Sequence, residues 1–264
     1  MNKVKISKSV ICITLLVLAS TFLSLAQGYR GIGEQPLNKK LMELPAISSE
    51  DIILVYNGFV VNYNDEKHIP NWVAYELTAE ETRGKIPRAK GFSMDLDYKG
   101  VQALREDYSN TGWDKGHMAP SADMKWSQTA MNESFYLTNV CPQNHDLNGK
   151  SWHSLEKKVR DWAIEYGHVY VVCGPYFTDN DFNTIGINQV AVPNGFFKAI
   201  LRQSGTEYYS IAFVFNNSPE KQPLKDAIIS VNDVEQIIGY DLFTNLSNRY
   251  EESVESQQEW DHWN

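Results

Sequence analysis

The 264-residue sequence contains only three cysteines, Cys12, Cys141 and Cys173, and their spacing is not that of a zinc site. Cys12 lies in an N-terminal segment that we expect to be removed. Cys141 and Cys173 leave two interpretations equally open: a disulfide formed in an oxidising compartment, or two small buried side chains. The sequence also lacks an HExxH motif, and although His145 and His153 lie near Asn148, their spacing does not favour zinc.

Basic residues are in the minority, with 24 Lys and Arg against 33 Asp and Glu and a formal net charge of −9. This balance is unexpected for a protein that must approach a polyphosphate. The charge is unevenly spread, however. Residues 83–160 contain twelve basic and nine acidic residues, whereas acids gather near the C-terminus. Local potential guides an anionic substrate more than total charge does, so the middle of the chain is the part suited to bind one.

Only one long apolar run is present, residues 10–25. It follows three lysines and ends in Ser24-Leu25-Ala26, which predicts a secretory signal peptide over residues 1–26. The alternative, a membrane anchor, is disfavoured because the run falls short of a span of about 20 residues. We therefore expect a secreted or periplasmic protein with no stable membrane anchor after cleavage.

The sequence has no internal repeat and no low-complexity linker, which favours a single domain. We assign residues 27–50 to a loosely packed leader, 51–244 to the domain, and 245–264 to an acidic, flexible tail. Segments rich in β-branched and aromatic residues predict strands at 52–61, 72–77, 168–177, 196–202 and 208–215. The pattern indicates an α+β fold in which a central antiparallel sheet is flanked by helices.

One helix is predicted over residues 151–166, where apolar side chains recur at three- and four-residue intervals before Gly167. Asn148 stands at its entrance. Helical geometry places Asn148, Trp152 and Glu156 along adjoining rows of one side. An amide oxygen and a carboxylate therefore share a face, and hard oxygen ligands of this kind suit Mg²⁺.

Three spaced motifs surround this helix: Asp114-Lys115-Gly116-His117-Met118-Ala119-Pro120, then Phe135 to Gln143 with Asn139-Val140-Cys141-Pro142-Gln143, then Leu147-Asn148 with Trp152 and Leu155-Glu156. In this order they resemble the DNA/RNA non-specific endonuclease family, which includes endonuclease G-like enzymes with a ββα-metal, or His-Me, finger. The resemblance is dense over about fifty residues, and several motifs in register are far more specific than one short pattern.

The resemblance implies a phosphodiester hydrolase that cleaves both DNA and RNA through backbone contacts and leaves 5′-phosphate ends. His117 would be the general base, and Asn148 would hold one hydrated Mg²⁺, with Mn²⁺ as a substitute. Glu156 would orient the water around the metal. A homodimer is left open.

The remaining site residues are assigned in the same way. Lys115 and either Arg88 or Lys90 would balance phosphate charge, with Arg88 preferred. Asp114, Asn139 and Gln143 would support the site. Buried carboxamides need hydrogen-bond partners, so the ordinary role of Asn139 and Gln143 is to tie their loop together.

Lys115 departs from the family pattern, which has arginine at this position. Lysine keeps the charge but lacks the planar fork that grips a phosphate through two hydrogen bonds. Two alternatives to an active nuclease follow: a nucleic-acid-binding protein with a weakened or retired site, and a hydrolase of another substrate, such as a glycosidase. The second is disfavoured because Glu156 has no carboxylate partner in the motif.

Overall fold

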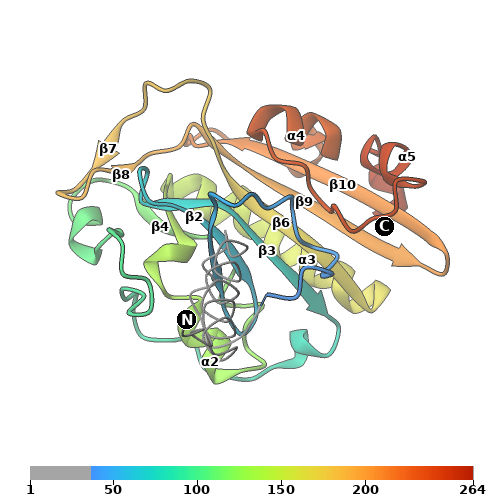
Figure 1. Cartoon of the computed structure of the whole chain (residues 1–264), viewed down its shortest axis with the longest axis horizontal. Helices are drawn as coiled ribbons and strands as arrows, with labels where there is room; N and C mark the ends of the chain where they lie inside the picture. Colours follow the sequence, from blue (N-terminus) through green and yellow to red (C-terminus); the bar gives the residue numbers. More distant parts are fainter. Residues whose placement is uncertain (1–36, 264) are drawn as a thin grey trace, which may run out of the picture.

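The computed structural model describes residues 37–263, so the predicted signal peptide and the start of the predicted leader lie outside the described residues. The centre is a seven-stranded sheet in the order β1-β2-β3-β6-β9-β10-β11, and every neighbouring pair is antiparallel (Figure 1). The strands are β1 Ile52–Val55, β2 Val60–Asn64, β3 Ile69–Thr78, β6 His168–Tyr176, β9 Gly195–Ser204, β10 Glu207–Asn216 and β11 Ile228–Ile229. The predicted α+β class with a central antiparallel sheet is confirmed.

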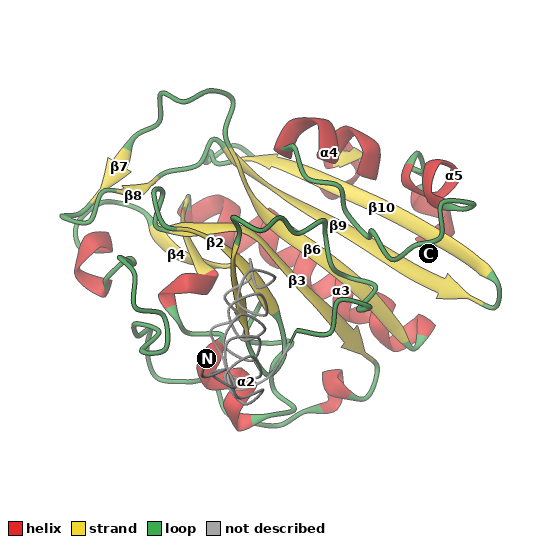
Figure 2. Cartoon of the chain, viewed as in Figure 1, coloured by secondary structure: helices red, strands yellow, loops and turns green. Residues whose placement is uncertain are grey.

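Both faces of the sheet are covered by other elements. Along β3, Val73 and Tyr75 belong to one hydrophobic core, while Trp72 and Ala74 belong to the other. Helix α3, His153–Tyr166, packs in the first core, and helices α4, Val231–Ile238, and α5, Glu251–Glu255, lie on the opposite face (Figure 2). Because side chains alternate along a strand, burial of both faces explains why central strands are buried at nearly every position.

Local sequence features explain where several elements begin and end. As predicted, helix α3 ends at Gly167, which adopts φ 92°, a conformation that favours glycine. Helix α4 begins with a capping box, in which Ser230 Oγ accepts from the Asp233 backbone N–H at 3.0 Å. Gly205, at φ 61°, lies in the turn between β9 and β10. The predicted strand 52–61 is wrong as a single element, because residues 56–59 form a turn closed by the Tyr56 N–H donating to Phe59 O at 2.9 Å.

The C-terminal segment is not a loose tail. Helix α5 packs on β10, and the last described turn, Trp260–Trp263, buries Trp263 completely against Trp162 at a ring-centroid separation of 4.7 Å. The prediction of a flexible tail over residues 245–264 is therefore wrong for the described residues. The segment is rich in acids, but its few apolar side chains pack against the domain.

The leader prediction is also wrong for residues 37–50. Leu44 is buried in the second core, and the Ala46 N–H donates to Asp241 O at 2.7 Å. These contacts attach the segment to the domain near the chain that follows α4.

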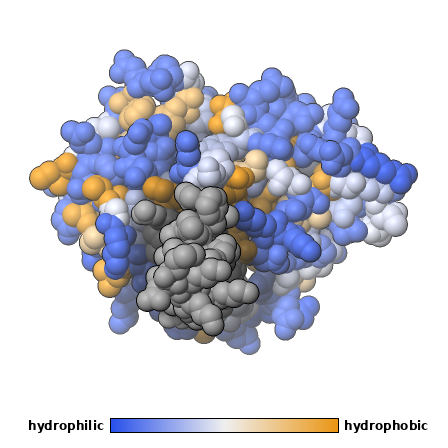
Figure 3. All heavy atoms as spheres, viewed as in Figure 1, coloured by the Kyte–Doolittle hydropathy of each residue, from blue (hydrophilic) through white to orange (hydrophobic). Residues whose placement is uncertain are grey.

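Hydrophilic residues cover most of the face seen in Figure 3. The large apolar side chains that are exposed include Leu96 and Ile187, the latter 89% exposed. Among residues 37–263, no helix is both long and apolar enough to cross a membrane.

Candidate active site

A small strand-strand-helix unit lies against the face of the main sheet that α3 covers. Strand β4, Asp114–His117, pairs antiparallel with β5, Val140–Gln143, so that His117 lies opposite Val140. A π-helical segment, Leu147–Trp152, then leads directly into α3. Trp152 joins the two parts, since its Nε1 donates to the His117 carbonyl oxygen at 3.3 Å. The helix and the histidine strand are thus fixed to each other.

Gly116 is required by the close packing of β4 on β5. A Cβ at this position would lie 2.2 Å from Gln143 Oε1, so any side chain would displace Gln143. Gln143 itself is buried, and its amide nitrogen and oxygen find no hydrogen-bond partner within the described chain. The expectation that Gln143 ties the loop through hydrogen bonds is therefore wrong, and it acts by packing on Gly116.

Asn139 does hydrogen-bond as expected of a buried carboxamide. Its Oδ1 accepts from the Ala119 N–H, and its Nδ2 donates to Ala119 O and Ser134 O, each at 2.9 Å. The Met118 N–H also donates to Asn139 O at 3.0 Å. These bonds hold the chain just after His117 and so fix the direction of the histidine backbone.

His117 is enclosed by aromatic rings. Phe92 and Phe135 lie 4.9 and 4.8 Å from its ring, centroid to centroid, and only 9% of the residue is exposed. Its Nε2 is buried without a hydrogen-bond partner among residues 37–263. Burial first, and then the positive charge of Arg88, lower the His117 pKa from its ordinary 6.5 to about 3. The imidazole is consequently neutral at physiological pH.

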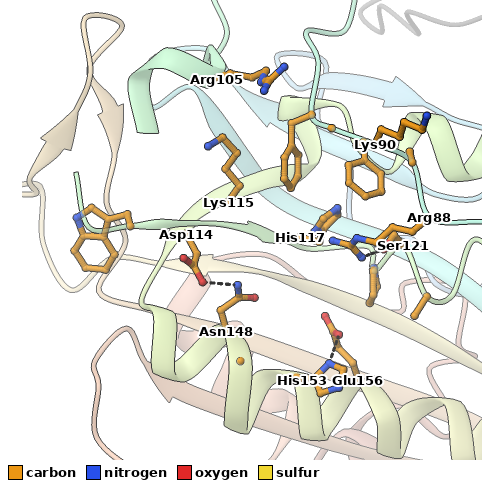
Figure 4. Close-up of a pocket in the computed structure, with 18 residues that line it drawn as sticks. Arg88, Lys90, Arg105, Asp114, Lys115, His117, Ser121, Asn148, His153 and Glu156 are labelled. Atoms are coloured by element: carbon orange, nitrogen blue, oxygen red, sulfur yellow. Dashed lines mark hydrogen bonds and ion pairs between the residues drawn. The ribbon is translucent and has the colours of Figure 1, made fainter. Parts of the chain in front are cut away.

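Asn148 is oriented by a carboxylate on the facing strand. Its Nδ2 donates to Asp114 Oδ2 at 2.9 Å, and His145 Nδ1 lies 3.0 Å from the same oxygen (Figure 4). The structure assigns no hydrogen bond between Asn148 Oδ1 and any described residue. The amide oxygen therefore stays available at the cavity, which Asn148 and Asp114 both line.

Glu156 lies on α3, two turns beyond Asn148, and lines the same cavity. Its Oε2 lies 3.7 Å from His153 Nδ1, and this contact raises the pKa of His153. Trp152, between Asn148 and Glu156 in the sequence, does not line the cavity. It is fully buried, and its indole donates to the backbone of His117.

Cations gather on the opposite side of a cavity of about 830 Å³. Arg88 donates to Ser121 Oγ and lies over the Phe135 ring at 4.8 Å from its centroid, and Lys90 lines the cavity beside it. Lys115 extends toward a different rim, where its Nζ lies 4.9 Å from the centroid of the Tyr108 ring. The cavity thus has Glu156 on the helix, Asp114 and Lys115 on β4, and Arg88 and Lys90 on a facing loop (Figure 4).

The structure brings together His117, Asn148, Glu156, Lys115 and Arg88 at one cavity, with Asp114 behind Asn148. Asn139 and Gln143 lie outside the lining, on the supporting strand and turn. Sequence reasoning missed other lining side chains, namely Arg105, Trp113 and Ser121. No local pattern distinguishes Arg105, because only folding carries residues 105–108 to this rim.

The two cysteines among residues 37–263, Cys141 and Cys173, are both free thiols, and both are buried. Cys173 lies on β6, where its thiol donates to Met118 O at 3.2 Å. The structure therefore supports two small buried side chains, and the alternative of a disulfide between them is wrong.

Comparison with known proteins agrees with this geometry. The family model for DNA/RNA non-specific endonucleases matches residues 38–249. Human mitochondrial endonuclease G is 35% identical over 206 residues, which cover 73% of this chain and 69% of the human protein. The mitochondrial nuclease EXOG of Danio rerio is 34% identical over 210 residues, 74% of this chain and 61% of the relative.

A nuclease of Nostoc sp. (strain PCC 7120) is 29% identical over 223 residues and 80% of each chain. Among solved structures, EndoG in the EndoG/EndoGI complex, described as showing the mechanism of EndoG inhibition, superposes with a TM-score of 0.74 at 26% identity. That match covers 82% of this chain and 96% of the other.

The family model and the relatives named nucleases support a nuclease that hydrolyses phosphodiester bonds, in place of a glycosidase, and the ββα unit with its cation-rimmed cavity agrees with that class. The chain belongs to the DNA/RNA non-specific endonuclease family, whose members are metal-dependent. The predicted secreted or periplasmic location is contradicted by the relatives, several of which are named mitochondrial nucleases.

Proposed function

We propose that this nuclease hydrolyses internal phosphodiester bonds of both DNA and RNA, with His117 as general base and one Mg²⁺ held by Asn148, and leaves 5′-phosphate ends. The observation that carries the proposal is the position of a buried, neutral imidazole in the same cavity as the amide oxygen of Asn148. A base and a Lewis acid beside one phosphate are what this hydrolysis requires.

His117 is suited to take a proton from the attacking water. Its pKa of about 3 keeps it unprotonated at neutral pH, and the low value is caused by burial and Arg88, so binding of an anionic phosphate raises it toward the working range. Because Nε2 is enclosed by the protein, we assign the base to Nδ1. Phe92 and Phe135 hold the ring in place and keep bulk water away.

The residues opposite His117 fit a hard, mostly hydrated divalent ion. Asn148 Oδ1 would be its direct ligand, and Asp114 would keep that oxygen turned toward the ion by holding the amide nitrogen. No group of three or more His, Cys, Asp or Glu able to hold a metal occurs in the described part of the chain, which suits Mg²⁺ because this ion retains most of its waters. When bound, the metal stabilises the negative charge that develops on the leaving oxygen.

The other lining residues act on water and phosphate. Glu156 would accept hydrogen bonds from the waters around the ion. Mn²⁺ would substitute for Mg²⁺ at this position. Arg88 is better placed than Lys90 to contact the scissile phosphate, because its charge acts directly on His117. Contacts of this kind reach the backbone and not base edges, which supports cleavage of DNA and RNA with little sequence preference.

The test uses purified protein with supercoiled plasmid and with single-stranded RNA, each in Mg²⁺ or EDTA, beside a His117→Ala variant. We expect both polymers to be degraded, and we expect degradation to stop with EDTA and to fall by about two to four orders of magnitude in the variant. Intact polymers across several divalent metals would refute the proposal. Degradation of only one polymer would refute the lack of sugar preference.

A further inference from the structure

Lys115 and Arg105 lie at one end of the cavity, away from Asn148. The Lys115 ammonium lies over the ring of Tyr108, which closes the same short helix, Arg105–Tyr108, that begins with the arginine. Arg105 Nη1 also lies 3.9 Å from where a Cβ on Gly91 would be, so the guanidinium reaches the loop that carries Lys90 and Phe92. The arginine therefore spans the rim between two walls of the cavity (Figure 4).

These two cations are not neutralised by an acidic side chain. Neither side chain makes an ion pair or a hydrogen bond with any residue in the described range. The charges of Arg105 and Lys115 repel each other, and the nearby carboxylates of Glu106 and Asp114 offset part of that repulsion at Lys115. Burial and then the charge of Arg105 lower the pKa of Lys115 despite those acids. Lys115 is half-buried and Arg105 is exposed at the rim, and two like charges held close together in this way form a site that favours an anion.

The short helix that carries Arg105 is firmly attached. Asp107, which is buried, accepts from the Leu104 N–H at 2.7 Å and from Asn188 Nδ2 at 2.8 Å, and Asn188 belongs to the hairpin of β7, Thr184–Ile185, and β8, Val190–Ala191. Gly186 packs so closely on Asp107 that a Cβ there would lie 2.3 Å from it. The guanidinium is thus displayed from a fixed base, which lowers the entropic cost of binding.

We propose that Arg105 and Lys115 form a second phosphate subsite, which holds the phosphate next to the scissile one on a nucleic-acid strand. Arg105 offers the planar fork that Lys115 lacks, so the pair combines a bidentate donor with a point charge. The site requires a substrate with at least two phosphates, and it favours polymers over dinucleotides. This inference rests on the proposed nuclease function.

The experiment compares kcat/KM on the dinucleoside monophosphate TpT, which has one phosphate, and on a 20-nucleotide oligothymidylate. Wild type, Arg105→Ala, Arg105→Lys and Arg249→Ala are assayed in Mg²⁺. Arg249, an exposed arginine that lies over Tyr250 outside the cavity lining, is the matched control. We expect Arg105→Ala to lower kcat/KM about tenfold on the 20-mer, through KM, and less than threefold on TpT. Arg105→Lys keeps the charge but loses the fork, so its kcat/KM on the 20-mer should lie between those of wild type and Arg105→Ala, and Arg249→Ala should match wild type.

A second measurement does not depend on turnover. In a His117→Ala background with EDTA, the slope of log Kd for the 20-mer against log salt concentration should fall by about 0.7 when Arg105 is removed, the value for one phosphate contact on a single strand. An equal loss on TpT and the 20-mer, or an unchanged slope, would overturn the subsite. Failure of wild type to cleave either substrate, with the slope change present, would instead count against the proposed hydrolysis and leave the subsite supported.

Discussion

Asp114 Oδ2 accepts the amide hydrogen of Asn148 across 2.9 Å, from a strand to the helix entrance. This contact decides which end of the carboxamide faces the cavity. We expect Asp114→Asn to lower activity about 10- to 100-fold and to raise the Mg²⁺ concentration needed for half-maximal rate, because the amide loses its charged acceptor. A metal titration of initial rates measures both effects.

The control for this prediction is His145→Ala. His145 contacts the same oxygen from an exposed position and does not line the cavity, so its removal should change the metal titration little. An Mg²⁺ requirement unchanged in Asp114→Asn would show that Asn148 does not depend on this carboxylate.

His117 should make stability depend on pH. Its pKa is about 3 in the folded protein and near 6.5 when exposed, so between these values the unfolded chain binds the proton and the folded chain does not. The free energy of unfolding should therefore decrease as pH is lowered from about 6.5 toward 3, and the contribution of His117 should be fully present above 6.5. Urea unfolding at several pH values should show a shallower decrease in His117→Gln. An identical decrease in the two proteins would mean that the histidine is not buried in its neutral form.

A buried ion pair supports the helix that carries Glu156. Arg160, one turn after Glu156, donates to Asp123 Oδ1 at 2.7 Å, and the Tyr75 hydroxyl donates to Asp123 Oδ2 at 3.1 Å. Asp123 is completely buried, so Asp123→Ala leaves Arg160 without its partner and should cost about 3 to 5 kcal/mol in the free energy of unfolding. Denaturant unfolding measures the loss. The exposed Asp161 on the same helix is the control, and Asp161→Ala should change stability by no more than about 0.5 kcal/mol.

The last described turn should matter for stability, contrary to the expectation of a free tail. Trp263 is fully buried beside Trp162 and Tyr166, so Trp263→Ala should lower the free energy of unfolding by about 3 to 5 kcal/mol. Its exposed neighbour Asp261 provides the comparison, and Asp261→Ala should leave thermal unfolding almost unchanged. If both variants unfold like wild type, the C-terminal turn is not docked in solution.

Much of the architecture could be predicted from local patterns. Segments rich in β-branched and aromatic residues located β3, β6, β9 and β10, and apolar spacing before Gly167 located α3, because both signals depend on residues close in the chain. The turn at residues 56–59 was missed although Asn57-Gly58, a dipeptide common in hairpin turns, stands between the two strands. The C-terminal docking was missed because a few buried apolar side chains, Leu246, Val254 and Trp263, can hold a segment whose average composition is acidic.

The sequence by itself determined the family and the residues His117, Asn148 and Glu156 at one cavity, since these depend on motifs and helical spacing within about fifty residues. It also indicated the central antiparallel sheet, through segments rich in β-branched and aromatic residues along the chain. Only the tertiary structure decided the environment of each group. The neutral state of His117 comes from the rings of Phe92 and Phe135 and the charge of Arg88, all distant in sequence. Likewise Arg105 reaches the cavity because its short helix is braced by a hairpin some eighty residues away. Desolvation and the sum of nearby charges are properties of three-dimensional packing, and no local pattern encodes them.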